Sequence, residues 1–327
     1  MPNPDTFTLY WSSLDMYEKC PQSFLWNKGW GVIDVGGGPG QKKPKPYKKS
    51  EHHAVMGTVI QAVVERFYND ELWNVLQPMM LRDRLLELAD EYLRLELAKR
   101  FVDWRLAGMT REEMAKTVRD GILGYMRTMK AHRLLGPYAK AELDMVAYVN
   151  KWTPIGGRAD LVVRRDDTGT TIVDGKNGRR YKDGKIQVDP DQLRWYALCF
   201  WLSYHQMPDR LGFVYYRYPS GDPILDADGK DTGAKEPGVE WIPYTRDDLK
   251  GLAQRAVDAR KAMNKERFQA TPDWRACRYC DYESVCPERQ SQKANNRRSP
   301  KSVEGLLDGI GGADGGIVEF TMGSEKP

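Results

Sequence analysis

The spacing of apolar residues changes along the chain from a helical period to a strand-like one and back. Between residues 52 and 135, apolar residues recur every three or four positions in GTVIQAVVERFY and LRDRLLELADEYLRLELAKRFVDW, which predicts amphipathic helices. From about residue 140, apolar and polar residues alternate in ELDMVAYV, GGRADLVVR and GTTIVDG, which predicts β-strands. The segment DPDQLRWYALCFWLSYH then predicts another helix, and LGFVYYRY another strand. Helices and strands are therefore both expected.

Loop-forming residues mark the limits of these elements. Pro21 interrupts a short predicted helix near the N-terminus, and residues 29–50, rich in Gly, Pro and Lys, predict a flexible basic loop. A helix is expected to begin at Thr245, because Asp248 three residues later completes a capping-box pattern. Residues 288–327 turn basic and then Gly-rich, which predicts a disordered tail. We predict a single domain over 1–287, with a helical part at about 52–135, a sheet core at about 140–218, and a C-terminal helix and cysteine cluster at about 240–287.

Composition narrows the class of protein only slightly. Apolar residues make up 41% of the chain and charged residues 29%, as in ordinary globular proteins. No apolar run approaches the length of about 20 residues that a membrane span needs, and the first residues lack a signal-peptide pattern, so a cytoplasmic location is expected. The net charge is +4 and the pI about 8.6. Basic residues cluster in three runs: Lys42, Lys43, Lys45, Lys48 and Lys49; Arg179, Arg180, Lys182 and Lys185; and Arg297, Arg298 and Lys301.

The tripeptide DGK occurs three times, at 174–176, 183–185 and 228–230. Only the first copy ends a predicted strand. A hairpin that turns around residues 167–169 sets Asp160 opposite Asp174 or its neighbour, and opposed residues share a face of the sheet. Lys176 shares that face because it lies two residues from Asp174. The other two copies are interpreted as turns, and the alternative for the first is a surface hairpin with scattered charges.

Two carboxylates and a lysine at one strand end suit a hydrolytic metal site. Neighbouring carboxylates repel each other unless one keeps its proton or a cation lies between them. Mg²⁺ or Mn²⁺ would relieve the repulsion of Asp160 and Asp174, and Lys176 would then orient an attacking water. The carbonyl oxygen of Gly175 is a candidate further ligand.

Residues before and after this hairpin extend the pattern. Gln61 and Glu65 lie four apart on one predicted helix, and Gln192 and Tyr196 four apart on another. Together with the hairpin residues they resemble the RecB-like branch of the PD-(D/E)xK nucleases. The positions that match are Gly57, Glu65, Gly157, Asp160, Asp174, Lys176, Gln192 and Tyr196.

The resemblance implies an α/β fold, with a mixed central sheet flanked by helices and an inserted helical region. It implies Asp160 and Asp174 as metal ligands, Lys176 as the catalytic lysine, and Gln192 and Tyr196 as residues that organise the site and the DNA strand. Glu65 is the helical acid of this motif. The family usually has a metal-binding histidine where this chain has Gln61, whose carbonyl is a weaker ligand.

The cysteines suggest a second site. Cys277, Cys280 and Cys286 are closely spaced, Cys20 is a remote candidate for a fourth ligand, and Cys199 lies on an apolar helix as a core residue. Four thiolates suit either a structural Zn²⁺ or a [4Fe–4S] cluster. This arrangement resembles the iron–sulfur members of the RecB-like group, of the Cas-four and AddB types, which favours a [4Fe–4S] cluster that joins the N- and C-terminal segments.

We therefore expect a Mg²⁺- or Mn²⁺-dependent deoxyribonuclease, an exonuclease that acts on single-stranded DNA or duplex ends in recombination, repair or replication. Lys42 to Lys49, Arg179 and Arg180 are candidate phosphate contacts. Trp11, Trp26 and Trp195 are candidates for base stacking, with core packing as the alternative. Three other functions remain open. One is a DNA-end-binding subunit that cuts weakly or not at all, one is a Cas-four-like factor with CRISPR-adaptation or recombination partners, and one is a zinc-containing structural protein.

Overall fold

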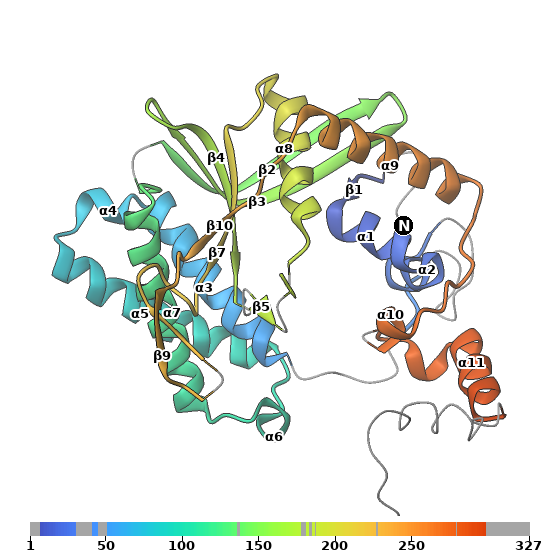
Figure 1. The fold of residues 1–327 in the computed structure, drawn as a ribbon, viewed down its shortest axis with the longest axis horizontal. Coiled ribbons are helices and arrows are strands. Elements are labelled where there is room, and N and C mark those ends of the chain that lie inside the picture. Colours follow the sequence, from blue (N-terminus) through green and yellow to red (C-terminus); the bar gives the residue numbers. More distant parts are fainter. Residues whose placement is uncertain are drawn as a thin grey trace, which may run out of the picture. The chain divides into compact units, whose positions relative to one another are not determined.

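A computed structural model of the chain describes residues 7–30, 41–44, 51–135, 138–177, 181–182, 185–186, 188–226, 228–278 and 280–298. Its contacts divide the chain into two compact units, Met1–Thr271 and Pro272–Pro327. The first unit contains the sheet and most of the helices (Figure 1). None of the described helices combines the length and the apolar character that a membrane crossing needs.

The central sheet of the described residues has six strands. Their order is β1-β3-β4-β7-β10, and β2 pairs with β3. The pairs β1–β3 and β4–β7 are parallel, whereas β2–β3, β3–β4 and β7–β10 are antiparallel. The strands are β1 (Leu9–Tyr10), β2 (Ala139–Asn150), β3 (Thr153–Arg165), β4 (Gly169–Lys176), β7 (Arg210–Tyr215) and β10 (Val239–Trp241).

The predicted helical region packs on this sheet. It consists of α3 (His52–Asn69), α4 (Leu72–Val75), α5 (Pro78–Lys99), α6 (Trp104–Ala107) and α7 (Arg111–Ala131). Val59 and Ile122 from two of these helices are fully buried in one hydrophobic core with Val173 and Val214 from the sheet. The periodic apolar residues therefore face the sheet, as their spacing predicts.

Two further helices contact the β2–β3 hairpin (Figure 1). Because β4 and β7 are parallel, a crossover must connect them, and it contains α8 (Pro190–Tyr204). Helix α9 (Arg246–Asn264) packs on α8 and begins with the predicted capping box of Thr245 and Asp248. Helices α1 (Trp11–Lys19) and α2 (Pro21–Lys28) precede them. The prediction of a mixed sheet flanked by helices is thus confirmed.

Three segments have structure that the sequence did not predict. Trp30, at the start of the predicted flexible loop, is fully buried among Phe7, Phe24 and Phe268. The Gly/Asp-rich segment after residue 220 forms a hairpin of β8 (Pro223–Leu225) and β9 (Asp231–Lys235), whose largely exposed residues give no alternating pattern. Short strands β5 (Tyr181–Lys182) and β6 (Lys185–Ile186) pair with each other.

The described part of the second unit contains α10 (Trp274–Arg278), the 3-10 helix η1 (Glu283–Val285) and α11 (Pro287–Arg298). The disorder predicted from residue 288 is wrong over α11. Its sequence PERQSQKANNRR has proline at the first helical position and several strong helix formers after it, a local preference that the low hydrophobicity of the tail concealed. The predicted domain boundary at residue 287 stays a prediction.

Candidate active site

The β3–β4 hairpin has the register that the sequence predicts. Leu161 pairs with Val173 and Arg165 with Gly169, so Asp160 is level with Asp174 on the neighbouring strand. The backbone N–H of Gly175 donates to Oδ2 of Asp160 over 2.8 Å. The two aspartates therefore lie side by side where β4 approaches its end.

Lys176 and Gln192 complete a compact polar cluster around Asp174. The Lys176 ammonium nitrogen lies 2.6 Å from Oδ2 of Asp174, a carboxylate that is almost fully buried. Gln192 donates to Oδ1 of Asp174 over 2.9 Å and accepts from Lys176 over 2.8 Å. Its amide nitrogen also lies 3.0 Å from the Tyr196 hydroxyl. The structure thus brings together the predicted strand-end and helical residues.

Contacts between helix α8 and the elements around it fix the positions of Gln192 and Tyr196. The ring of Tyr196 packs close to Gly157, where a Cβ would lie only 3.1 Å from the ring. Burial and the nearby Asp174 raise the pKa of Tyr196 far above its ordinary value. Gly157 therefore permits the close approach of α8 to β3 that sets Tyr196 beside the acids.

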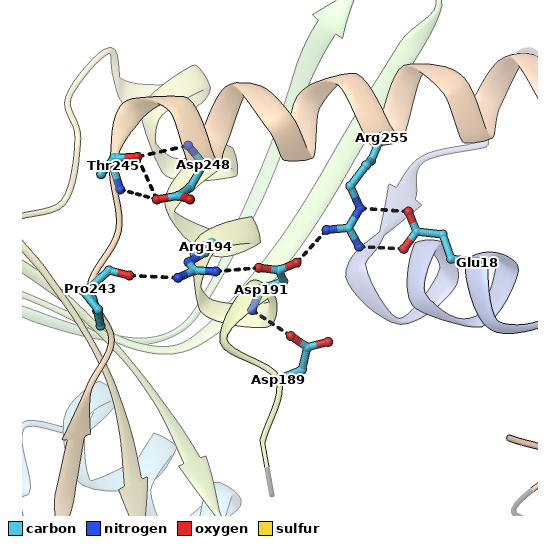
Figure 2. A network of polar contacts seen from close by, with 8 residues as sticks. All are labelled: Glu18, Asp189, Asp191, Arg194, Pro243, Thr245, Asp248 and Arg255. Carbon is cyan, nitrogen blue, oxygen red and sulfur yellow. Dashed lines mark hydrogen bonds and ion pairs between the residues drawn. The ribbon is translucent and has the colours of Figure 1, made fainter. Parts of the chain in front are cut away.

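The first turn of α8 is fixed by an ion-pair network (Figure 2). Arg255 on α9 donates to Asp191 over 2.6 Å and makes two hydrogen bonds to Glu18 on α1, of 2.9 and 2.6 Å. Arg194 joins Asp191 to the carbonyl oxygen of Pro243, over 2.9 and 3.1 Å. Because Asp191 directly precedes Gln192, the network holds the backbone from which the Gln192 side chain reaches Asp174.

Helix α3 supplies the predicted Gln61 and Glu65. A hydrogen bond from Gln61 to Asp160 lowers the pKa of that carboxyl, although larger effects raise it. Glu65 contributes negative charge near Glu142 and raises its pKa. Gly57, the matching glycine one turn before Gln61, has open space around its Cα.

Glu142 belongs to the same acidic group but was missed by the sequence analysis. Ala141 pairs with Leu161 and Leu143 with Ala159, so Glu142 is level with Asp160 on the other side of β3. Its φ of 51° lies in the left-handed region, which a non-glycine residue rarely adopts. Burial and then Glu65 raise the pKa of Glu142. Extending the predicted strand pairing to ELDMVAYV would have found this residue.

The electrostatics of the two aspartates suit a divalent cation. Burial first, and then the charge of Asp174, raise the pKa of Asp160 well above its ordinary value. Burial also raises the pKa of Asp174, although the Lys176 charge opposes this. Oδ2 of Asp174 is buried and has no hydrogen bond besides its ion pair. A buried pair of neighbouring carboxylates fits a hard oxygen-binding cation such as Mg²⁺, which would offset their repulsion.

Few protein side chains at this site are available as metal ligands. Among the described residues, no group of three or more His, Cys, Asp or Glu side chains is gathered closely enough to hold a metal ion. Mg²⁺ commonly keeps several waters and uses only one or two protein carboxylates, so the pair of Asp160 and Asp174 is compatible with it.

Two buried tyrosines lie behind the acids. Burial and the charge of Asp160 raise the pKa of Tyr216 well above its ordinary value. The ring of Tyr125 packs edge-on against it, with ring centroids 5.2 Å apart. A Cβ at Gly175 would collide with the Tyr216 hydroxyl, so only glycine fits between the site and this buried wall.

The other residues that the sequence singled out are the third DGK copy, three tryptophans and the basic runs. In the third DGK copy, the backbone N–H groups of Asp228 and Lys230 donate to Asp226, as expected of a turn. Trp26 and Trp195 are buried, which favours core packing over base stacking, and half-buried Trp11 packs against Trp195. Lys42 is exposed and Lys43 lies over the Trp26 ring. Lys45, Lys48, Lys49, Arg179, Arg180, Asp183 and Gly184 lie outside the described residues.

The cysteines give no support for a cluster. Cys20 lies in the first compact unit, whereas Cys277, Cys280 and Cys286 lie in the second, and within the described residues they form no ligand group of three or more. The Cys280 sulfur accepts a hydrogen bond from the Tyr282 N–H over 3.4 Å, and Cys286 donates to Glu288 over 3.3 Å. Cys199 is fully buried, as expected of a core residue. The four-cysteine site stays a prediction.

Comparisons with known proteins place the chain in a family. A model of the PD-(D/E)XK nuclease superfamily matches residues 10–287. No curated protein sequence matches significantly. Among solved structures, one described as "Crystal structure of SSO0001" aligns with a TM-score of 0.30 and 16% identity, and the alignment covers 74% of this chain and 89% of that one. From the match over most of its length, we conclude that this chain belongs to the PD-(D/E)XK nuclease superfamily.

Proposed function

We propose that the protein is a metal-dependent deoxyribonuclease, and more narrowly an exonuclease on single-stranded DNA or duplex ends. The observation that carries the proposal is the cluster of Asp160, Asp174 and Lys176 at adjoining positions of β3 and β4. Membership of a nuclease superfamily implies a nucleic acid as substrate and a divalent metal as cofactor. The restriction to DNA and to chain ends rests on the resemblance of the motif order to RecB-like nucleases.

Asp160 and Asp174 would hold Mg²⁺ or Mn²⁺, with the Gln61 amide oxygen and the Gly175 carbonyl as further oxygen ligands. The bound ion would lower the pKa of water and offset negative charge that develops on the phosphate. Lys176 directs its ammonium group to the same place and can orient the attacking water. Gln192 fixes both Asp174 and Lys176 by hydrogen bonds, and Tyr196 supports Gln192.

A cleavage assay tests this function. Purified protein with Mn²⁺ or Mg²⁺ is expected to shorten end-labelled single-stranded DNA, and Asp174→Ala is expected to abolish the cleavage. Linear and circular single strands of one sequence separate an exonuclease, which leaves circles intact, from an endonuclease. Failure of the parent protein to cut any DNA in a way that Asp174→Ala removes would overturn the proposal.

One observation favours a second function, that of a DNA-end-binding subunit. Gln61 stands where the family usually has histidine, and it hydrogen bonds Asp160, so the metal has one weaker protein ligand. Under this alternative the protein binds DNA ends without cutting them. Substitution Gln61→His discriminates between the two, because it is expected to raise the cleavage rate of an enzyme and to leave a binding subunit inactive.

A further inference from the structure

A pocket lies where α5 ends and α6 and α7 begin, apart from the acidic cluster. It has a volume of about 480 Å³. Its lining includes Arg94, Arg100 and Arg111, the aromatic residues Phe101 and Trp104, and no acidic residue. Such a lining is positively charged and suits an anionic ligand with a flat apolar part.

Two of the arginines are available to a ligand. Arg100 is held by Glu96 over 2.9 Å and by Thr58 over 3.3 Å. Arg94 and Arg111 are exposed, and neither forms an ion pair with any described residue. The carboxylate of Asp90, one turn before Arg94, is taken by Arg119 through bonds of 2.9 and 2.6 Å. Guanidinium groups without a partner bind phosphate oxygens through paired hydrogen bonds.

The aromatic residues add a surface for a base. Phe101 is 48% exposed and Trp104 is 37% exposed, although both side chains are large and apolar. Exposed rings beside cationic groups are the arrangement by which proteins bind single-stranded nucleic acid, because every base offers a flat face for stacking.

Another arginine-containing pocket differs in that acidic residues also line it. Arg133, Arg164 and Arg165 line it together with Asp166 and Asp167. Asp167 accepts from Arg133 over 2.8 Å and from Arg165 over 3.0 Å. Its positive charge is therefore largely compensated within the protein, which makes it the weaker phosphate site.

The cationic–aromatic pocket is connected to the acidic cluster through α3. Arg100, on the pocket wall, donates to Thr58 on this helix. Gln61 follows three residues later, about 4.5 Å along the axis, and it hydrogen bonds Asp160. Helix α3 therefore carries contacts to both the pocket and the acidic cluster.

We propose that this pocket binds a nucleotide of the substrate strand, with its phosphate on Arg94 and Arg111 and its base against Phe101 and Trp104. The proposal rests on the proposed nuclease function and adds a substrate-binding position to it.

Binding of a fluorescent single-stranded oligonucleotide, measured by anisotropy in EDTA over a range of salt, tests the pocket without cleavage. The double variant Arg94→Ala/Arg111→Ala is expected to bind about tenfold more weakly at low salt. The slope of log K against log salt should also fall by about 1.4, because each contact to a single-strand phosphate contributes about 0.7. Arg105→Ala, an exposed arginine on α6 outside the pocket lining, is the matched control and should bind like the parent.

A separate variant tests the contribution of Phe101 and Trp104 to binding. Phe101→Ala/Trp104→Ala is expected to weaken binding about fivefold or more while leaving the salt slope unchanged, because stacking releases no counterions. Thermal unfolding verifies that each variant is folded. If the parent protein binds and cuts DNA but the arginine variant shows the parental affinity and salt slope, the pocket proposal is rejected and the proposed function stands. A parent that neither binds nor cuts DNA would overturn the proposed function and the pocket together.

Discussion

The ammonium nitrogen of Lys176 lies 2.6 Å from Oδ2 of Asp174, two residues away on the same strand end. Gln192 bridges the pair, since its amide donates to the carboxylate and its carbonyl oxygen accepts from the ammonium. The lysine therefore stabilises the ionised form of a buried acid and is held in one direction. This geometry leads to specific expectations for the site and its support.

Replacing Lys176 by methionine keeps the length of the side chain and removes its charge. We expect the cleavage rate to fall about 100-fold or more, because a positioned proton-transfer or water-orienting group contributes that much. Affinity for DNA should change little. Steady-state cleavage and oligonucleotide binding measure the two effects. Lys250→Met is the control, since Lys250 pairs with Asp247 on the exposed face of α9. A Lys176→Met protein that cuts at the parental rate would contradict the catalytic assignment.

Asp160 should make stability fall as the pH rises. Its pKa is raised in the folded state by burial and by Asp174, so the folded protein holds a proton that the unfolded chain loses near pH 3.9. The free energy of unfolding is therefore expected to decrease from about that pH up to the raised pKa. Asp160→Asn removes this loss, so without divalent ions the variant should be more stable than the parent near neutral pH.

Urea unfolding of parent and variant across this pH range measures the effect. Asp144→Asn is a control of opposite sign, because a hydrogen bond from Arg158 lowers the pKa of Asp144. An Asp160→Asn protein that is less stable than the parent at neutral pH would show that the two aspartates do not repel each other.

Gly175 is expected to tolerate no side chain. An added Cβ would collide with the Tyr216 hydroxyl, and Tyr216 is fixed in the core, so Gly175→Ala should destabilise the protein by about 1–3 kcal/mol. Gly57→Ala, with open space on α3, should instead stabilise it by up to about 1 kcal/mol. Thermal unfolding compares the two. Equal effects of both substitutions would refute the predicted clash.

Breaking the network around α8 should affect the rate as well as stability. Arg255→Gln removes the bonds to Asp191 and Glu18, and we expect a loss of about 1–2 kcal/mol for these partly exposed pairs. Because Asp191 adjoins Gln192, kcat should fall more than KM rises. Glu18→Gln weakens the α1 side of the network and keeps the bond to Asp191, so it should cost stability with little change in kcat. The same loss of kcat in both variants would assign Arg255 a purely structural role.

Analysis of the iron and sulfide content of the purified protein tests the predicted iron–sulfur cluster. Protein purified without oxygen is expected to contain iron and acid-labile sulfide in equal amounts and to be brown. Cys20→Ser, Cys277→Ser, Cys280→Ser and Cys286→Ser should each lose the cluster, whereas Cys199→Ser at the buried position should keep it. A colourless protein that contains zinc favours the alternative of a structural Zn²⁺, and one free of both metals rejects the four-cysteine site.

Much of the fold could be predicted because its signals are local. The helical and alternating periods gave the positions of α3, α5 and α8 and of the strands around the site, and the capping residues gave the start of α9. The hairpin of β8 and β9 was not predicted, since its exposed residues show no pattern that burial would impose. Trp30 was assigned to a loop because its aromatic partners are as far away as Phe268.

By itself, the sequence placed Asp160 opposite Asp174 or its neighbour, and placed Gln192 and Tyr196 on one face of a helix. A short turn and the two-residue period of a strand fix the first, and the helical repeat fixes the second. Only the tertiary structure decided that Tyr216 closes the space beside Gly175 and that Arg255 holds the first turn of α8. Each of these contacts joins elements that are distant along the chain, and packing of the whole core brings them together.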